Sequence, residues 1–588
     1  MKRLTLIALS LTVLVPAIVR AQEERVPLAR VGATVIDRAT FLKRYENAVW
    51  IGKERSGVSI VPKHAFLLAL IAEELLAHEG ERRGLDQERP VRPILEEIER
   101  MLVLDALYRT EVQEPIRLTE AEIDSVARLR LAPVTFAYLT IGDSARAWHV
   151  YRQVQQASDP IAAFDSLQQA LGQAGQLRTA RWGELYEPLE TFLYAGATPG
   201  QAGPPVSVDS LYYLVQLLNR ATPALITPDA WQQARYEAGR ILQERRERAR
   251  FADFMQRFGA GKTAQVNDTL FYRLADAIRT RLTLRQVQLE RRNRPRYPVA
   301  LLESDREALR LELGDVLDAP LIEAPTFTRT LGYVLDRLAF RGFELRNERQ
   351  SVPYRLRALL WEIIAEEFLL EEGYARGLDR RLDVQQDLAM WRKAYLARGM
   401  RKVLVDSLRE AWRGQLWLVN LCRATLSTKE AATRLQQRWM QMPESCKADG
   451  ITVDTTGYRL APTLGSVGAL AVTAAPGAVL GPFAESCSPK AASCWRVYRL
   501  LDRRRPDDPE AAFQEAAREE VNAYIARLAE QRGVTIDMEA LEATRVTPIN
   551  MVLVRLLGFG HRLLAVPTVY PLIEWFDRMD KRRLYAPL

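Results

Sequence analysis

IAEELLAHEGERRGLD, at Ile71–Asp86, returns as IAEEFLLEEGYARGLD at Ile364–Asp379. The two stretches are 293 residues apart, and eleven of their sixteen positions are identical. Agreement of this degree over apolar, acidic and glycine residues together is not expected by chance. The sequence therefore predicts that one module has been duplicated, so that each copy can be checked against the other.

Both copies have the pattern of an amphipathic helix that reaches its end. Apolar residues recur every four positions and form one stripe along the helix: Leu67, Ile71 and Leu75 in the first copy, and Leu360, Ile364 and Phe368 in the second. The Arg-Gly-Leu-Asp that follows suits a helix stop with a left-handed glycine and an apolar contact after it: Gly84 with Leu85, and Gly377 with Leu378. A second helix is predicted after each stop, at residues 94–108 and about 384–408.

Outward from the repeat, the helix and strand patterns predict a mainly helical α+β chain built from tandem parts. Each copy of the helical segment leads into a small α/β sandwich, and a long helix follows each sandwich. The expected parts are a signal peptide (1–21), two helical segments (26–131 and 321–412), two sandwiches (133–222 and 415–504), a long helix with a helical linker (223–320) and a helical C-terminal region (505–588).

The first sandwich is predicted to run strand, helix, helix, short helix, strand, which implies an antiparallel sheet. These elements are expected at residues 134–141, 144–156, 161–172, 188–196 and 211–218, and those of the second sandwich at 416–421, 429–440 and 495–501. Long helices are expected at 228–258 and 509–532, a strand at 29–36, and helices at 40–49 and 120–129. Residues 271–320 and 540–588 are expected to be mostly helical additions that have no counterpart in the other copy.

The charge pattern argues against a nucleic-acid partner. The formal net charge is +8, but Arg and Glu alternate along the predicted helices instead of forming a block of one sign. That alternation is typical of solvated helix faces. A basic balance nevertheless favours encounter with acidic or unfolded polypeptides.

The chain begins with the pattern of a secretion signal. Lys2 and Arg3 precede an apolar run at residues 4–18, and Val19-Arg20-Ala21 predicts cleavage before Gln22. No cysteine follows the cleavage site directly, so no lipoprotein anchor is indicated. A retained anchor is disfavoured because the apolar run is short for a membrane span. Residues 551–576 are apolar but are interrupted by charges and prolines, so we expect an exported, periplasmic protein without stable membrane insertion.

All four cysteines lie in the second half of the chain. An even number of cysteines in an oxidising compartment suggests disulfides. Cys487 and Cys494 flank a polar loop between two strand-like runs and are the first predicted pair, which leaves Cys422 and Cys446 as the second. Their spacings do not fit a zinc site, which needs closely spaced pairs.

The order of these parts resembles the SurA/PrsA-type periplasmic folding factors. Such proteins have an N-terminal helical chaperone segment, one or more parvulin-like peptidyl-prolyl isomerase domains, and a C-terminal helix that packs back onto the N-terminal segment. The resemblance covers most of residues 26–270 and 322–536. Its matching pieces are ARVGATVIDRATFLKRY, the EELL…RGLD helix end, LVLDALYRTEV, Gly-Pro-Pro-Val before SLYYLVQLLNR, and Gly-Pro-Phe before CWRVYRLLDRR.

The resemblance does not extend to the parvulin histidine pair. Parvulins carry one histidine in the opening strand and one in the closing strand, facing each other beneath the prolyl pocket. Here VTFAYLTI places Tyr138 at the first position and LYYLVQLLNR places Tyr213 at the second, while Arg496 takes the closing position in the other sandwich. Because lowering the ~18–20 kcal/mol barrier requires a site that binds the twisted amide, we expect impaired catalysis. Tyr138 and Tyr213 are predicted to act structurally, as a cross-strand aromatic pair.

Other candidate sites favour structural interpretations. His149 is predicted on a helix surface, His78 at a helix edge, and His64 and His561 in loops without clustered ligands, so we expect no metal. Lys262, in FGAGKT, is not part of a phosphate loop because Gln256 stands where the first glycine is required. We therefore expect no cofactor.

The leading functional hypothesis is a periplasmic chaperone whose apolar helix faces hold unfolded or extended client polypeptides. Trp182, Phe192 and Tyr194 are candidate peptide contacts on the first sandwich, with ordinary core packing as the alternative. A second hypothesis is an active parvulin-type isomerase with a substituted site. A third is a structural envelope protein that makes fixed partner contacts.

Overall fold

The structure is a computed structural model of the 588-residue chain. It describes residues 26–48, 50, 53, 60–88, 91–222, 225–442, 446, 450–485, 494–547, 554–559 and 563–585. The chain divides into two compact units. Unit 1 comprises Met1–Asp105 and Leu370–Leu588, and unit 2 comprises Ala106–Leu369.

Unit 1 contains a three-stranded antiparallel sheet that joins the two ends of the described chain. Its order is β16–β1–β2, with β1 at Pro27–Val31, β2 at Thr34–Asp37 and β16 at Val534–Ile536. The single strand predicted over residues 29–36 is therefore wrong. Gly32 adopts φ +57°, and this left-handed backbone folds the run into a two-residue hairpin.

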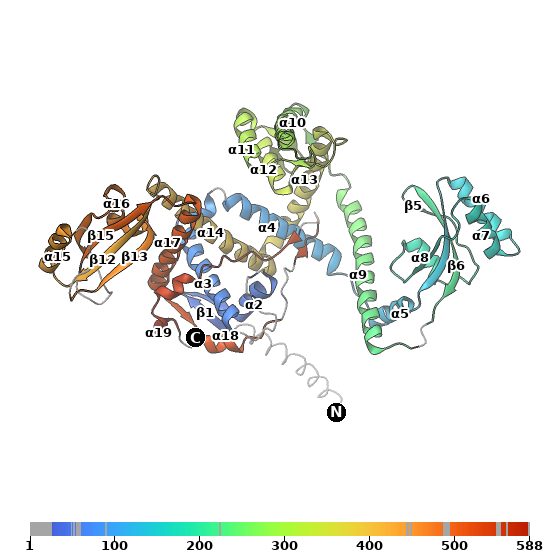
Figure 1. Ribbon diagram of the computed structural model, residues 1–588. Helices are drawn as coiled ribbons and strands as arrows, with labels where there is room; N and C mark the ends of the chain where they lie inside the picture. The colour runs from blue at the N-terminus through green and yellow to red at the C-terminus, as the bar shows by residue number, and fades with distance from the viewer. Residues whose placement is uncertain are drawn as a thin grey trace. The chain divides into compact units, whose positions relative to one another are not determined.

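Helices from both halves of the sequence cover this sheet and build the main core of unit 1. They are α2 (Arg38–Asn47), α3 (Ile60–Arg82), α14 (Leu382–Ala411), α17 (Pro509–Arg532) and α18 (Met538–Ala543). The helix α3 packs along α14, and Phe41, Tyr45 and Phe66 form an aromatic cluster in the core. In Figure 1 the blue N-terminal elements lie among the red C-terminal ones.

The repeated helix ends are confirmed. Gly84 and Gly377 adopt φ +73° and +68°, and short turns follow at Leu85–Gln87 (η1) and Leu378–Arg380 (η4). The predicted second helices are also present, as α4 (Val91–Tyr108) and α14. Both extend beyond the predicted bounds by a few residues.

Residues 540–588 are not mostly helical over the part that the structure describes. Apart from α18 they hold β17 (Arg555–Leu556), β18 (Leu563–Leu564), a 3-10 turn η6 (Glu574–Arg578) and α19 (Lys581–Leu584). Pro567 and Pro571 lack the backbone N–H that a helix needs for its hydrogen bonds. The segment instead contributes Trp575 to the core, where this residue is fully buried and donates its indole N–H to Leu68 O at 3.3 Å.

The second sandwich, also in unit 1, is a four-stranded antiparallel sheet of order β13–β12–β15–β14. Its elements are β12 (Leu418–Leu426), α15 (Lys429–Gln441), β13 (Val453–Leu460), a 3-10 turn η5 (Ala461–Leu464), α16 (Gly465–Thr473), β14 (Val479–Glu485) and β15 (Cys494–Arg504). The antiparallel sheet is confirmed. The strand β14 lies at the strand-like run expected before Cys487, whereas the strand β13 and the helix α16 were not predicted from sequence.

Unit 2 contains the first sandwich, whose sheet has the corresponding order β4–β3–β6–β5. Its elements are β3 (Val134–Ile141), α6 (Ser144–Gln156), α7 (Pro160–Ala170), β4 (Leu177–Ala180), α8 (Glu187–Tyr194), β5 (Val206–Val208) and β6 (Leu211–Arg220). The helices α6 and α7 cover one face of the sheet, and α8 covers the other (Figure 1). The sandwich lies between α5 (Glu120–Arg130) and α9 (Pro228–Gly259) in the sequence.

The rest of unit 2 is a helical lobe around a second three-stranded sheet, of order β10–β9–β7. The elements are β7 (Gln265–Val266), α10 (Asp268–Arg291), β8 (Val299–Ala300), α11 (Glu303–Glu312), η3 (Gly314–Val316), β9 (Pro320–Glu323), β10 (Thr328–Thr330), α12 (Leu331–Arg341), β11 (Glu344–Leu345) and α13 (Val352–Ala375). Residues 271–320 are thus not an addition, because Phe271, Leu274 and Ile278 of α10 are central to this core. No helix in the described ranges is long and apolar enough to span a bilayer.

Candidate functional site

Tyr138 and Tyr213 lie on the same face of the first sandwich but are not opposite each other. In the β3–β6 register Tyr138 faces Val215, and Tyr213 faces Thr140. The two tyrosines are therefore diagonal neighbours. The predicted cross-strand pair is replaced by a contact along one strand, in which the rings of Phe136 and Tyr138 lie 6.4 Å apart.

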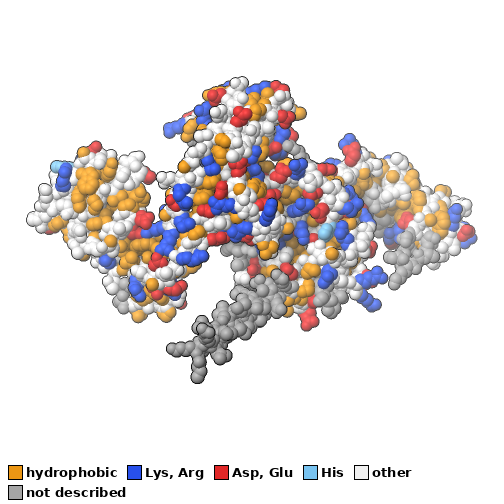
Figure 2. Space-filling view, turned by 180° about the vertical axis from the view of Figure 1, so that it is seen from behind, with side chains coloured by type: hydrophobic (Ala, Val, Ile, Leu, Met, Phe, Trp, Pro, Cys, Tyr) orange, Lys and Arg blue, Asp and Glu red, His pale blue; other side chains and the backbone are white. Residues whose placement is uncertain are grey.

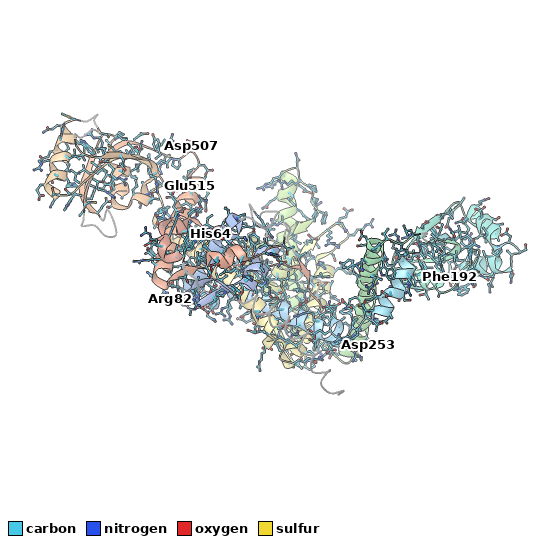
Figure 3. The ribbon with its side chains drawn as sticks, turned by 90° about the horizontal axis from the view of Figure 1, so that it is seen from below. His64, Arg82, Phe192, Asp253, Asp507 and Glu515 are labelled. Carbon is cyan, nitrogen blue, oxygen red and sulfur yellow. The ribbon has the colours of Figure 1, made fainter. Side chains whose placement is uncertain are left out.

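The helix α8 packs on this face and brings the predicted aromatic residues together. Tyr138, Tyr213, Trp182 and Phe192 border one apolar cluster whose buried members include Tyr194. Phe192, labelled in Figure 3, rests against Gly203 so closely that a Cβ there would come within 2.6 Å of its ring. Sequence reasoning therefore selected residues that do meet in space, although they come from four separate elements or loops.

Tyr194 is a core residue and not an open peptide contact. It is 8% exposed, its hydroxyl donates to Ala180 O at 3.2 Å, and the Arg220 guanidinium lies 5.7 Å from its ring centroid. Burial, reinforced by the nearby Glu190 carboxylate, raises the pKa of Tyr194 to about 12. The amphipathic pattern of α8 could not separate this buried position from its exposed neighbours.

Trp182 is covered as well, by α9. The Arg245 guanidinium lies 4.2 Å from the Trp182 ring centroid and pairs with Glu190 at 2.6 Å. Burial raises the pKa of Glu190 even though Arg245 and the backbone N–H of Gly183 bind its carboxylate. Trp182 thus fastens the sandwich to α9, and of the three predicted peptide contacts only Phe192 is neither deeply buried nor placed under a guanidinium.

The second sandwich has arginines at the corresponding positions. Arg496 is opposite Thr425, and Arg423 is opposite Tyr498. Both sandwiches have an irregularity at the same place in the opening strand, between Thr135 and Phe136 and between Asn420 and Leu421. Tyr138 and Arg423 each lie two residues after the irregularity, so Arg423 corresponds to Tyr138. On the closing strand, Arg496 corresponds to Tyr213. Sequence reasoning missed Arg423 because the irregularity shifts the register and leaves no signal in the residue types.

These arginines belong to an ion-paired network. Arg423 Nε lies 3.0 Å from Asp454 Oδ1, and this hydrogen bond lowers the pKa of the Asp454 carboxyl despite partial burial. Arg496 Nη1 lies 2.5 Å from Glu485 Oε2, and the Tyr498 hydroxyl donates to Glu485 Oε1 at 2.8 Å. Burial, with the Glu485 carboxylate, raises the pKa of Tyr498 to about 12. A guanidinium stays protonated, so neither arginine can act as a base near neutral pH.

The described histidines lie outside both sheets. His64 and His78 are on α3, and His149 is exposed on α6; Figure 3 labels His64 and Arg82 toward the two ends of α3. His64 packs edge-on against Phe576, and burial lowers its pKa. His78 Nε2 lies 3.2 Å from Glu74 Oε1 and 3.0 Å from Thr34 Oγ1. His561 lies outside the described residues.

The cysteines differ in part from the predicted pairing. Cys494 is disulfide-bonded, while Cys487, its predicted partner, lies outside the described residues. Cys422 and Cys446 are free thiols, so their predicted disulfide is wrong for this structure. Cys422 Sγ points at the backbone carbonyl of Cys446, at 3.9 Å, within a buried cluster. Burial raises the pKa of the Cys422 thiol. In the described parts of the chain, no three His, Cys, Asp or Glu side chains are arranged to hold a metal.

A groove of about 530 Å³ lies in the helical part of unit 1. Its residues come from β2, α2, α3 and α14. The apolar members include Val35, Leu70 and Met390. Its volume is within the usual range of ligand pockets, about 300–1,000 Å³.

Unit 2 has a different feature, an aromatic stripe on α13. Tyr354 and Trp361 are 73% and 57% exposed. They are seven positions apart in the sequence, which places them on one face of the helix. The other face of α13 is buried in the lobe core through Leu356, Leu360 and Ile363.

No protein-family model and no curated protein matches the chain. Solved structures of folding factors do overlap with parts of it. A SurA-like chaperone of Campylobacter jejuni is 12% identical, covering 37% of this chain and 90% of its own, with a TM-score of 0.17. PrsA of Bacillus anthracis is 12% identical, covering 32% of this chain and 96% of its own, with a TM-score of 0.18. The foldase PrsA of Streptococcus pneumoniae is 14% identical, covering 37% of this chain and 85% of its own, also with a TM-score of 0.18.

Proposed function

We propose that this chain is an exported folding chaperone that holds unfolded envelope polypeptides. The observation that carries the proposal is the aromatic stripe Tyr354–Trp361 on α13. Large apolar side chains grouped on a soluble surface are typical of interaction sites. Holding an unfolded chain requires weak contacts in many registers, which an exposed aromatic stripe supplies without catalytic geometry.

The first sandwich offers further apolar surface. Leu177, Tyr186, Ile161 and Trp148 are exposed on it, and Figure 2 shows hydrophobic side chains gathered on this part of the chain, at the left of the view. We infer that it serves as an additional surface for extended peptide, with Phe192 as the one predicted contact that is neither deeply buried nor placed under a guanidinium.

The two sandwiches are proposed to be parvulin-like copies with impaired isomerase chemistry. Their common strand order and common irregularity support descent from one unit. Tyrosines in one and ion-paired arginines in the other stand where the resemblance calls for imidazoles. In the second sandwich, Asp454 and Glu485 already hold the arginines, so neither guanidinium is free to turn toward a twisted prolyl amide.

The proposed location is the periplasm, reached through the predicted signal peptide with cleavage before Gln22. The proposed clients are unfolded or extended envelope polypeptides, and no nucleic acid or cofactor enters the proposal.

The test measures two activities on one sample of the purified mature chain. We expect it to suppress aggregation of a urea-unfolded outer-envelope protein, and to leave the rate of prolyl isomerisation in a coupled proline-peptide assay at its uncatalysed value. Replacing Tyr354→Ser with Trp361→Ser is expected to weaken suppression several-fold without lowering Tm, because both side chains are exposed. Leu311→Ser is the control, since it removes an 87% exposed apolar side chain from α11 and is expected to change little.

Two outcomes would favour the other hypotheses. Isomerase turnover that disappears in Tyr138→Phe with Tyr213→Phe would show a working catalytic site on the first sandwich. A saturable complex with one folded partner, together with no suppression of aggregation, would favour a structural envelope protein.

A further inference from the structure

The strand β2 is an edge strand of the unit 1 sheet. Among the residues that the structure describes, β1 is its only strand partner, on one side. The two-residue turn after Val31 makes Val31 and Thr34 a hydrogen-bonded pair, so the next pair, Arg30 with Val35, is a non-hydrogen-bonded pair. In such a pair the N–H and C=O point away from the neighbouring strand. Val35 therefore turns a backbone donor and a backbone acceptor outward.

The residue that carries these outward groups also lines the groove. Val35, Ile36 and Asp37 of β2 contribute to its lining, as do Ala389 and Met390 of α14. Val35 is 41% exposed, and the thioether of Met390 adapts its shape to different side chains. An exposed edge that opens into a partly apolar groove is the arrangement used in strand addition, where the main chain gives affinity and pockets receive alternate side chains.

The charges of the groove indicate which kind of strand it accepts. Arg44 forms two bonds to Glu73, of 2.7 and 3.0 Å, and Lys393 lies 2.9 Å from Glu74. The two remaining charged groups are also engaged: Lys43 pairs with Asp387, and Asp37 caps α2 by accepting from the N–H of Thr40 at 2.8 Å. Every charged side chain of the groove thus has a partner within the chain, so a strand without charges is its electrostatic complement.

We propose that the groove binds an extended, uncharged client segment that adds to β2 as a fourth strand. The incoming main chain bonds to the outward N–H and C=O of Val35, and alternate apolar side chains enter the space lined by Leu70, Ala389 and Met390. This inference rests on the proposed chaperone function and names the conformation and chemistry of the client segment.

The decisive variant is Val35→Pro. It deletes the outward N–H and leaves the bonds to β1 intact, and proline is tolerated on an edge strand where its nitrogen faces outward. Val35→Thr is the matched control, because it keeps both the N–H and the β-branched shape. The probe is a fluorescent eight-residue peptide of alternating Val and Thr with blocked ends, followed by anisotropy with the full mature chain.

We expect Val35→Pro to weaken binding by about tenfold, and Val35→Thr to stay within about twofold of the wild type. An N-methylated twin of the peptide, which cannot donate its amide hydrogens, is expected to bind the wild type at least about tenfold more weakly. A photo-crosslinker at Ala389 is expected to capture the unmethylated peptide, and this experiment decides the matter if Val35→Pro fails to fold.

The proposal is overturned if both Val35 variants bind equally, if methylation has no effect, or if Ala389 captures no peptide. It is also overturned if Val35→Pro changes only self-association, since the edge would then serve a second copy of the chain. In all of these cases aggregation suppression by the wild type still tests the chaperone proposal separately.

Discussion

Buried polar residues in the sandwiches are used to satisfy backbone carbonyls. Gln216 of β6 is 1% exposed and donates to Pro160 O at 2.8 Å and to Gly200 O at 2.9 Å. Arg499, one residue beyond the Tyr498 that corresponds to Val215, is 2% exposed and donates to Met442 O at 2.6 Å and to Trp439 O. A buried donor is costly without a partner, so these side chains tie a loop or a helix end to the sheet.

Glu79 has a comparable structural role in unit 1. Its carboxylate accepts from Arg82 at 2.7 Å, from Arg83 at 2.8 Å and from the Tyr524 hydroxyl at 3.0 Å. The hydrogen bond from Arg82 is the main reason why the pKa of Glu79 falls to about 2, against the opposing effect of burial. Because Tyr524 belongs to α17, this carboxylate links α3 to α17.

A pH dependence of stability follows from this carboxylate. The folded pKa of about 2 lies below the unfolded value of about 4.3, so the stabilisation is complete above about pH 4.3 and fades as the pH falls toward 2. We expect Glu79→Gln to lower the free energy of unfolding by about 1–2 kcal/mol at pH 7, and the gap to the wild type to narrow steadily below pH 4. Urea unfolding of both proteins between pH 7 and 3 measures this gap. Glu530→Gln, on an exposed position of α17, is the control. A difference in unfolding free energy between the wild type and Glu79→Gln that does not change with pH would contradict the lowered pKa of Glu79 in the folded state.

At the scale of elements, a glycine of the repeated stretch marks where helices cross. A Cβ on Gly80 of α3 would lie 3.0 Å from Leu396 O of α14. A Cβ on the corresponding Gly373 of α13 would lie 2.6 Å from Val103 Cγ1 of α4. In both places the helix from one copy of the predicted module meets the second helix of the other copy. The repeat therefore preserves a close approach between helices as well as an apolar stripe.

This close approach predicts the effect of adding one methyl group. Gly373→Ala forces the rigid branched side chain of Val103 to move, and we expect a loss of about 1–3 kcal/mol in unfolding free energy. Gly239→Ala is the matched control, because Gly239 lies inside α9 with its nearest neighbour at 3.9 Å, where alanine gains up to about 1 kcal/mol of helix propensity. Chemical denaturation of the two variants compares them directly. Equal effects at both glycines would mean that the crossing tolerates the methyl group.

Elements with strong local patterns could be predicted from the sequence, and edge elements could not. The bounds of β3, α6 and α17 agree with the prediction, because alternation, helical periodicity and capping residues are signals contained in the local sequence. The edge strands β4, β5 and β13 were missed because they are short or lack alternation. At the candidate site, the sequence identified Tyr138, Tyr213 and Arg496, but not Arg423. Only the pairing of β12 with β15 reveals Arg423, since an irregularity in a strand is a tertiary feature.

At the scale of the whole molecule, each unit is assembled from both halves of the sequence. In unit 1, β16 near the C-terminus pairs with β1, and α14 packs on α3. In unit 2, β7 precedes the helical lobe in the sequence yet pairs with β9, and α10 fills the lobe core. The outer strand β16 of the unit 1 sheet thus follows the second sandwich, and the outer strand β7 of the unit 2 sheet follows the first. The long helices α17 and α9 connect each sandwich to that outer strand.

This exchange predicts that the halves stay together when the chain is cut. Residues 292–296, between α10 and β8, are exposed and accept a site for a sequence-specific protease. The N-terminal fragment keeps β1, β2 and α3 of unit 1 together with β7 and α10 of unit 2, and the C-terminal fragment keeps their partners. Separation would expose two hydrophobic cores to water. We therefore expect a tag on the N-terminal fragment to retain the C-terminal fragment in native buffer, and the cut chain to elute with the 66.8 kDa uncut chain.

The control is the same tag-affinity column run in guanidinium chloride. It should release the untagged C-terminal fragment and so prove that the cut is complete. An untagged fragment that flows through in native buffer would contradict the exchange. Each half would then have to complete its own sheet, with β7 on β1 and β16 on β9. Pairing of β16 with β1 and of β7 with β9 joins the two halves, whereas pairing of β7 with β1 and of β16 with β9 keeps each half separate. Retention of the C-terminal fragment therefore distinguishes the two arrangements, and neither core has to be mutated for the test.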